Sequence, residues 1–159
     1  MQRSLIRSAQ LKMTFLFRDM IRFTIDGTAV PKQRPRMSGR VAYTPKKTRD
    51  YEERVRQAFR FSYRGETPVF HKGVSVKVCI EVIQQIPKSW SNSKTLKAER
   101  GEIAPVSRNG DLDNIAKSIL DALNTLAYED DAQVTLLMIS KRYGADPYAT
   151  VRIEEDSNE

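Results

Sequence analysis

Five charged residues around one predicted helix carry the clearest chemical signal in the sequence. Asp111 and Asp113 lie two apart in the segment DLD, and Asp130 and Asp131 are adjacent in the segment EDD. Lys117 follows Asp113 by four residues, so both side chains lie on one helix face. Carboxylate oxygens are the hard ligands that Mg²⁺ takes, with octahedral geometry and retained waters. The pattern indicates a Mg²⁺ site that activates a water against a phosphodiester, with Lys117 stabilising the added negative charge.

The same residues also have structural interpretations. Asp113 suits a helix N-cap, Asp111 would favour the positive helix end, and EDD could form a turn before a strand. Lys117 could simply pair with Asp121. Each role is individually more common than catalysis. Together they explain less, because a lysine in the first helical turn opposes the helix dipole unless carboxylates or a phosphate lie there.

The composition excludes several other chemistries. A length of 159 residues fits one domain that can bury its own core. The single cysteine, Cys79, rules out an intrachain disulfide, and the single histidine, His71, rules out a His-rich zinc site. His71 lies in a turn-like segment, where we expect it to be exposed. No apolar run approaches the roughly 20 residues that span a bilayer, so we expect a cytoplasmic protein without a membrane partner or a small-molecule cofactor.

The positive charge is concentrated in residues 32–64. This segment holds eleven Lys/Arg against three Asp/Glu, in a chain whose formal net charge is +7. Such a block is the electrostatic footprint of a protein that binds a polyanion. Solvated surface arginines and an acidic membrane surface are the alternatives, and nucleic acid is the preferred partner. Prolines and glycine predict a loop in its first half, and the 3.6-residue period of Tyr51, Val55 and Phe59 predicts a helix in its second half.

Alternating apolar residues predict four strands, at 21–27, 74–83, 133–143 and 148–155. Residues 133–143 are apolar on both faces, so we expect that strand to be central in the sheet. Helices are expected at 112–126 and, shorter, within 84–110, ending near Gly101. Trp90 in that segment is expected to pack on the body of the domain, with stacking on an unpaired base as the alternative.

This order predicts an α/β (α+β) fold, namely a two-layer sandwich with a mixed β-sheet, helices packed on it and a C-terminal β-hairpin. We expect a single nuclease domain over residues 20–155. Residues 1–19 are interpreted as a disordered extension or a mis-assigned start, and residues 156–159 as a frayed tail.

The motif around the carboxylates resembles the RusA family of Holliday junction resolvases, which is common in phages and prophages. The similarity rests on "DLDNIAKSILDALN" and "AYEDDAQV", and extends to "RPR", "YTPKKTRDYEERV", "PKSWS" and "YGADPYATVRIEE". It covers roughly residues 21–155. Residues 1–19 have no counterpart in the family, and the 84–110 segment is longer than in its shortest members.

The resemblance implies essential carboxylates at Asp111, Asp113 and Asp131, a further candidate metal ligand at Asp130 and a catalytic lysine at Lys117. It implies Mg²⁺ as cofactor, with Mn²⁺ as a substitute, and homodimers that make paired symmetric nicks in four-way junction DNA. Two equivalent cuts independently suit a two-fold dimer.

We expect the phosphate contacts, which contribute affinity rather than sequence readout, to come from Lys32, Arg34, Arg36, Lys46, Lys47 and Arg49. Two other functions stay open. One is a nuclease for flaps, forks or RNA, and the other is a non-catalytic module that binds branched DNA.

Overall fold

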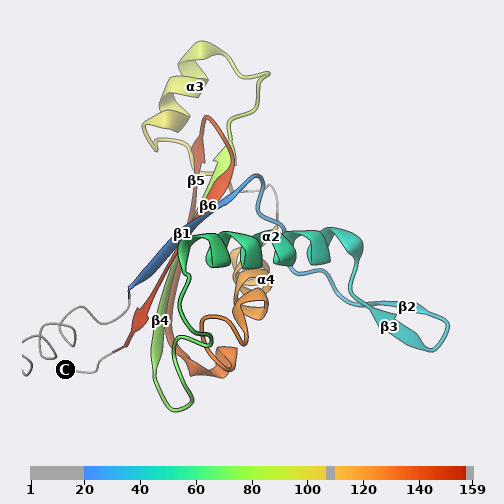
Figure 1. Ribbon diagram of the computed structural model, residues 1–159. Helices are drawn as coiled ribbons and strands as arrows, with labels where there is room; N and C mark the ends of the chain where they lie inside the picture. The colour runs from blue at the N-terminus through green and yellow to red at the C-terminus, as the bar shows by residue number, and fades with distance from the viewer. Residues whose placement is uncertain (1–19, 107–109, 157–159) are drawn as a thin grey trace, which may run out of the picture.

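A four-stranded mixed sheet forms the body of the molecule (Figure 1). The computed structural model describes residues 20–106 and 110–156, so the expected N-terminal extension and most of the tail lie outside the described residues. The strands run in the order β1 (Ile21–Asp26), β6 (Tyr148–Glu155), β4 (Val76–Gln85) and β5 (Val134–Gly144). β4 is parallel to β5 and antiparallel to β6, which is antiparallel to β1. The mixed sheet is therefore confirmed.

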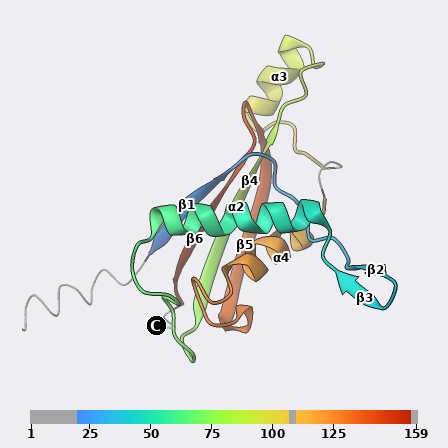
Figure 2. The ribbon, with the colours of Figure 1, turned by 45° about the vertical axis from the view of Figure 1, so that its right-hand side comes forward.

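Two helices, α2 (Lys46–Ser62) and α4 (Leu112–Leu123), cross one face of this sheet (Figures 1 and 2). α2 buries Tyr51, Val55 and Phe59, and the Phe59 ring meets that of Phe23 on β1 edge to face, with centroids 5.7 Å apart. One hydrophobic core joins both helices to β1, β4 and β6. The predicted two-layer arrangement is confirmed.

The position of β5 corrects one prediction. β5 lies at the edge of the sheet, not in its centre. Its exposed apolar residues are Leu136, Leu137 and Met138, with 40%, 40% and 48% of their surface accessible. Apolar residues on both faces usually indicate a central strand. However, the pattern indicates only that both faces of the strand suit burial, and does not say which neighbouring element covers them.

The expected C-terminal hairpin is present in connectivity but not in pairing. β5 and β6 are consecutive, run in opposite directions and are joined by the turn 145–147. However, β4 lies between them and pairs with both. The last strand in chain order thus inserts beside the first strand, where its alternating residues Ala149, Val151 and Ile153 are fully buried.

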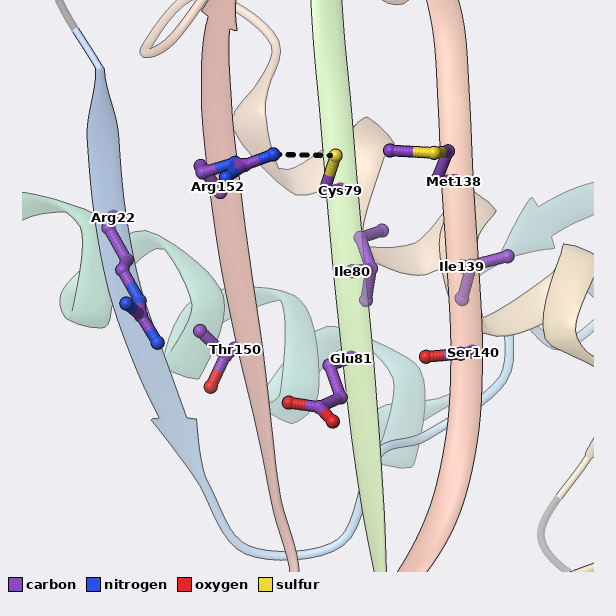
Figure 3. Close-up of a pocket in the computed structure, with 9 residues that line it drawn as sticks. All are labelled: Arg22, Cys79, Ile80, Glu81, Met138, Ile139, Ser140, Thr150 and Arg152. Atoms are coloured by element: carbon purple, nitrogen blue, oxygen red, sulfur yellow. Dashed lines mark hydrogen bonds between the residues drawn. The ribbon is translucent and has the colours of Figure 1, made fainter. Parts of the chain in front are cut away.

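The other face of the sheet is polar. An open hollow of about 470 Å³ lies on it, and its walls include Arg22, Cys79, Glu81 and Arg152 (Figure 3). An Arg152 amino group lies 3.6 Å from the Cys79 sulfur. Cys79 is a free thiol, as a lone cysteine must be.

Within the basic segment, the predicted loop contains a hairpin. β2 (Arg36–Ser38) and β3 (Val41–Tyr43) pair antiparallel and project away from the body in both views (Figures 1 and 2). Gly39 at its tip has φ +62°, a value that glycine adopts without steric cost. All residues of both strands are exposed, so no apolar alternation marks them in the sequence.

The remaining helix, α3 (Asn92–Glu99), stands near the end of β5 (Figure 1). The Trp90 ring packs on Tyr143 with centroids 5.1 Å apart, and Lys94 Nζ lies 3.9 Å from the indole centroid. The packed role expected for Trp90 is confirmed, and His71 is exposed as expected. Within the described residues, no helix is long and apolar enough to cross a membrane.

Candidate active site and nucleic-acid interface

The polar side of α4 carries the first part of the site. Ile115, Ile119 and Leu123 are fully buried, so the helical period directs Asp113, Lys117 and Asp121 away from the core. The helix is shorter than predicted. It ends at Leu123 because Asn124 is extended and Thr125 has φ 65°, which turns Leu126 into the core from the following loop.

The N-cap of α4 is Asp111, and its side chain makes no capping hydrogen bond. Asp113 lies in the first helical turn, not at the cap. Both residues are exposed. The structural interpretation of Asp113 as an N-cap is therefore wrong, and the capping role does not occupy the Asp111 carboxylate.

The turn before Asp111 is packed tightly against a second segment. Gly110 has φ +89°, and a Cβ atom there would lie 2.5 Å from Cγ of Pro31. The backbone N–H of Lys32, the residue after Pro31, donates a 2.8 Å hydrogen bond to the backbone carbonyl of Asn114. The start of the basic segment therefore lies directly on the first turn of α4.

The second part of the site is the EDD segment, which Gln133 holds in place. EDD leads into a short 3-10 helix, η1 (Asp131–Gln133). The side-chain nitrogen Nε2 of Gln133 donates to the backbone carbonyls of His71 and Val74 at 2.9 and 3.1 Å. The side-chain oxygen Oε1 of Gln133 accepts a 2.9 Å hydrogen bond from the backbone N–H of Glu129. Asp130 caps η1 by accepting a 2.8 Å hydrogen bond from the Ala132 amide. The structural role expected for this pair is thus fulfilled by Asp130.

Asp131 lies in a field of other charges. Partial burial raises the pKa of Asp131, and the carboxylates of Asp121 and Asp130 raise that pKa further, while Lys117 opposes the shift. Beneath them, the buried Tyr128 hydroxyl donates a 3.0 Å hydrogen bond to the Leu120 carbonyl. Burial raises the pKa of Tyr128 far above its usual value, and the same carboxylates add to the effect. Asp131, Asp121 and Lys117 therefore share one electrostatic site.

Lys32 joins this site rather than the exposed basic surface. Its ammonium group is 2.8 Å from Oδ2 of Asp121 and also bonds Glu52 of α2. Lys117 approaches the other oxygen of Asp121 at 3.8 Å. Burial lowers the pKa of Lys32, but the hydrogen bonds to Asp121 and Glu52 outweigh burial and raise it, so Lys32 is charged.

The donor set suits Mg²⁺. Across residues 20–106 and 110–156, no three His, Cys, Asp or Glu side chains form a group that could hold a metal ion together. Mg²⁺ does not require such a cage, since it is commonly held by one or two carboxylates, waters and substrate phosphates. Burial and, after it, the nearby carboxylates of Asp121 and Asp130 raise the pKa of Asp131, and a divalent cation would offset the negative charge that these carboxylates share.

Five of the six predicted phosphate-binding residues lie on or beside the hairpin and the start of α2. Arg36 begins β2, Arg34 precedes it and is exposed, and the first turn of α2 adds three more exposed cations, Lys46, Lys47 and Arg49. That turn contains no acidic residue. Lys46 pairs with Asp50 at 2.7 Å. Arg34, Arg36, Lys46, Lys47 and Arg49 all fall within residues 34–49, and we call them the basic surface.

Sequence reasoning missed three members of the site or its support. Asp121 was considered only as a partner of Lys117, and Glu52 only as one of the few acids in a basic segment. Gln133 was noted only within the motif DDAQV. A buried acid surrounded by cations, such as Glu52, is the signal that could have revealed the pairing with Lys32.

Replacement of Gln133 by alanine is expected to lower the free energy of unfolding by about 1–3 kcal/mol, because one side chain that ties Glu129 to the partly buried 70–74 segment is lost. The melting temperature should fall by about 2–4 °C for each kcal/mol lost. Thermal and urea unfolding followed by circular dichroism would measure this. The matched control is Gln57→Ala on the exposed side of α2, expected to change stability by less than about 0.5 kcal/mol. Equal effects of the two substitutions would contradict the anchoring role of Gln133.

Comparison with known proteins agrees with this geometry. The family model for endodeoxyribonuclease RusA matches residues 26–154. The uncharacterized protein YqaN of Bacillus subtilis (strain 168) is 38% identical over 145 residues, which cover 87% of this chain and 99% of that protein. The chain therefore belongs to the RusA family of endodeoxyribonucleases, a family of Holliday junction resolving, generally divalent-metal-dependent enzymes.

Proposed function

We propose that this protein is a Mg²⁺-dependent, structure-specific endodeoxyribonuclease that resolves Holliday junctions by paired symmetric nicks during DNA recombination and repair. The observation that carries the proposal is the shared field of Asp131, Asp121 and Lys117, in a chain of this family. It supplies acidic oxygens for a cation and an ammonium group for phosphate charge, and uses no histidine.

In the proposed mechanism, Asp111, Asp113 and Asp131 would hold Mg²⁺ together with water and a substrate phosphate, with Asp130 as a further candidate. Among the described residues these carboxylates do not form a ready-made group, so the bound phosphate and the cation would have to draw them together. Asp130 already caps η1 through one oxygen, and its side chain also interacts with Asp131, so a metal-binding role would be shared with these contacts. The chemistry that bound Mg²⁺ supplies is activation of a water molecule and neutralisation of phosphate charge. Lys117, with 61% of its side chain accessible, is exposed enough to meet a phosphate and stabilise the additional negative charge of the transition state.

The basic surface is the proposed phosphate-binding region. Three cations in the first turn of α2 face the positive end of the helix dipole, an unfavourable arrangement that an anion relieves. The hairpin adds Arg36 beside the exposed Met37, Val41 and Tyr43. A two-stranded ribbon of this kind fits the width of a DNA major groove. Four-way junction DNA is the partner that this surface and the family together favour.

We further propose that the protein is a homodimer joined through β5. Within the described residues β5 is an edge strand, and its Leu136 and Met138 on one face and Leu137 on the other are all exposed. Further along the same strand, the open sheet face instead carries a polar cross-strand pair, Arg142–Glu81 at 2.6 Å. An exposed apolar edge strand is a template for pairing with another strand. A second copy would bury it by a two-fold contact and supply the second active site.

The first test is nicking of a labelled synthetic four-way junction with Mg²⁺ or with EDTA. The wild-type protein should make paired symmetric cuts that EDTA abolishes. Asp113→Asn should reduce the cutting rate by more than about 100-fold, beyond the 10–100-fold loss typical of residues that only support a metal ligand. Junction binding should persist or tighten, because the substitution removes negative charge facing phosphate.

The matched control is Asp146→Asn in the exposed turn before β6, which should cut normally. Loss of binding in step with loss of cutting by Asp113→Asn would argue against its catalytic assignment. Preference for flaps, forks or RNA over junctions in competition would change the substrate. Tight binding without cleavage under any divalent ion would leave a binding module.

The basic surface predicts the salt dependence of junction binding. Arg36→Gln and Lys47→Gln should each lower the slope of log K against log salt concentration by about 0.9 for every phosphate that the protein no longer neutralises. Filter binding or fluorescence anisotropy over a salt series measures the slope. Lys97→Gln on α3 makes the same charge change away from the basic surface and should leave the slope unchanged. If all three substitutions lowered the salt slope equally, the cause would be the net charge of the protein rather than direct binding of phosphate.

The proposed dimer predicts a change of mass in solution. Leu137→Glu and Met138→Glu place charges on the β5 edge and should convert dimers to monomers, as measured by light scattering after size exclusion. Leu96→Glu on α3, where leucine is 50% exposed, is the control that should keep the dimer mass. A wild-type monomer, or a dimer that survives both β5 substitutions, would place the second copy elsewhere or exclude it.

A further inference from the structure

We infer that Lys32 is a positioning residue, which holds Asp121 and through it Lys117, and does not bind phosphate. This inference rests on the proposed nuclease function, because Lys117 is the group whose placement it explains. It removes Lys32 from the six cations that the sequence assigns to DNA.

The ammonium group of Lys32 is already satisfied within the protein. Its side chain is 22% accessible, and its two partners, Glu52 and Asp121, are 10% and 24% accessible. By comparison, Lys46 of the basic surface has 80% of its side chain accessible. A phosphate that recruited Lys32 would have to break two ion pairs and leave the nearly buried Glu52 with only its longer, 3.9 Å contact to Arg56, which is costly.

The backbone around Lys32 is fixed as well. The Lys32 amide is bonded to the Asn114 carbonyl of α4, and the preceding Pro31 contacts Gly110. The following Gln33 amide lies 3.4 Å from the Thr48 hydroxyl oxygen of α2. Lys32 therefore bridges α2 and α4 from a segment that both helices hold.

The two carboxylate oxygens of Asp121 have different lysine partners. Oδ2 is held by Lys32 at 2.8 Å, and Oδ1 faces Lys117 at 3.8 Å. Asp121 also contributes to the negative potential at Asp131. The Lys32 ammonium thus fixes the Asp121 carboxylate in one orientation and offsets its charge, so that Lys117 is attracted without being captured in a close ion pair. Loss of Lys32 should free Asp121 to bind Lys117 directly and withdraw it from the phosphate.

A salt series separates positioning from phosphate binding without requiring cleavage. Junction binding is measured in EDTA for Lys32→Met and for the control Lys47→Met, which lies on the basic surface. Lys32→Met should keep the wild-type slope of log K against log salt, while Lys47→Met should lower it by about 0.9 for each phosphate that it no longer neutralises. A lower slope for Lys32→Met, equal to that of the control, would overturn the inference.

Single-turnover cleavage at saturating protein then tests the catalytic consequence. Lys32→Met should cut about 10–100 times more slowly, the range found for residues that orient a catalytic group. Lys97→Met on α3, which lies outside both the site and the basic surface, should cut at the wild-type rate. Lys32→Arg, which keeps a cation between both acids, should recover most of the rate. A normal rate for Lys32→Met would overturn the positioning role.

A double-substitution cycle tests whether Lys32 acts through Asp121. In an Asp121→Asn background, Lys32→Met should change the cleavage rate by less than about threefold, because the intermediary is already lost. Independent, multiplying effects would overturn the pathway. If Lys32→Met does not fold, Glu52→Gln loosens the same lysine from α2, and it should slow cutting with an unchanged salt slope. A normal cutting rate for Glu52→Gln would then overturn the inference.

Failure of this inference differs from failure of the proposed function. A wild-type protein that cuts no branched substrate sinks the nuclease and the positioning role together. A wild-type protein that cuts, with a Lys32→Met variant that cuts equally well, sinks only the role of Lys32.

Discussion

Burial of the apolar side of α4 against the sheet and α2 is the constraint on which the rest of the site depends. Ile115, Ile119 and Leu123 leave that helix a single rotation about its axis, because each is fully buried. Asp113, Lys117 and Asp121, which are four residues apart, consequently lie along one exposed face of α4. Hydrophobic packing therefore sets which face of α4 carries these charges, and ion pairs such as Lys32 with Asp121 then orient the side chains on that face.

Repulsion between carboxylates and attraction by lysines both act around the charged face of α4. Burial raises the pKa of Asp131 and neighbouring carboxylates add to that rise, while Lys32 and Lys117 offset part of the charge on Asp121. The basic surface continues in the chain directly from Lys32, through a backbone that contacts the first turn of α4. The proposed binding surface and the proposed chemistry are therefore parts of one packed unit, connected over a few residues of main chain.

Much of this could be predicted from the sequence, because periodicity reports which side of an element is buried. The strands, the two long helices and the position of Asp113 and Lys117 on one helix face follow from spacing alone. Spacing does not show which residues from other elements lie beside a given side chain. It therefore misplaced β5, whose apolar faces suit a central strand. It also could not show that Lys32 pairs with Glu52 and Asp121, which come from distant parts of the chain. The β2–β3 hairpin was missed because its short strands bury nothing.

The insertion of β6 between β1 and β4 has a consequence for biosynthesis. A ribosome releases β1 early and β6 last of the strands, yet these two are neighbours in the finished sheet. Until β6 emerges, β1 has no strand to pair with and the sheet consists of β4 and β5 alone. Asp111, Asp113 and Asp131 are synthesised after β4 and before β6, so the nascent chain first carries its proposed DNA-cutting residues on a sheet that still lacks its connecting strand. The framework around these residues is therefore complete only when the strand that joins β1 to β4 has been made.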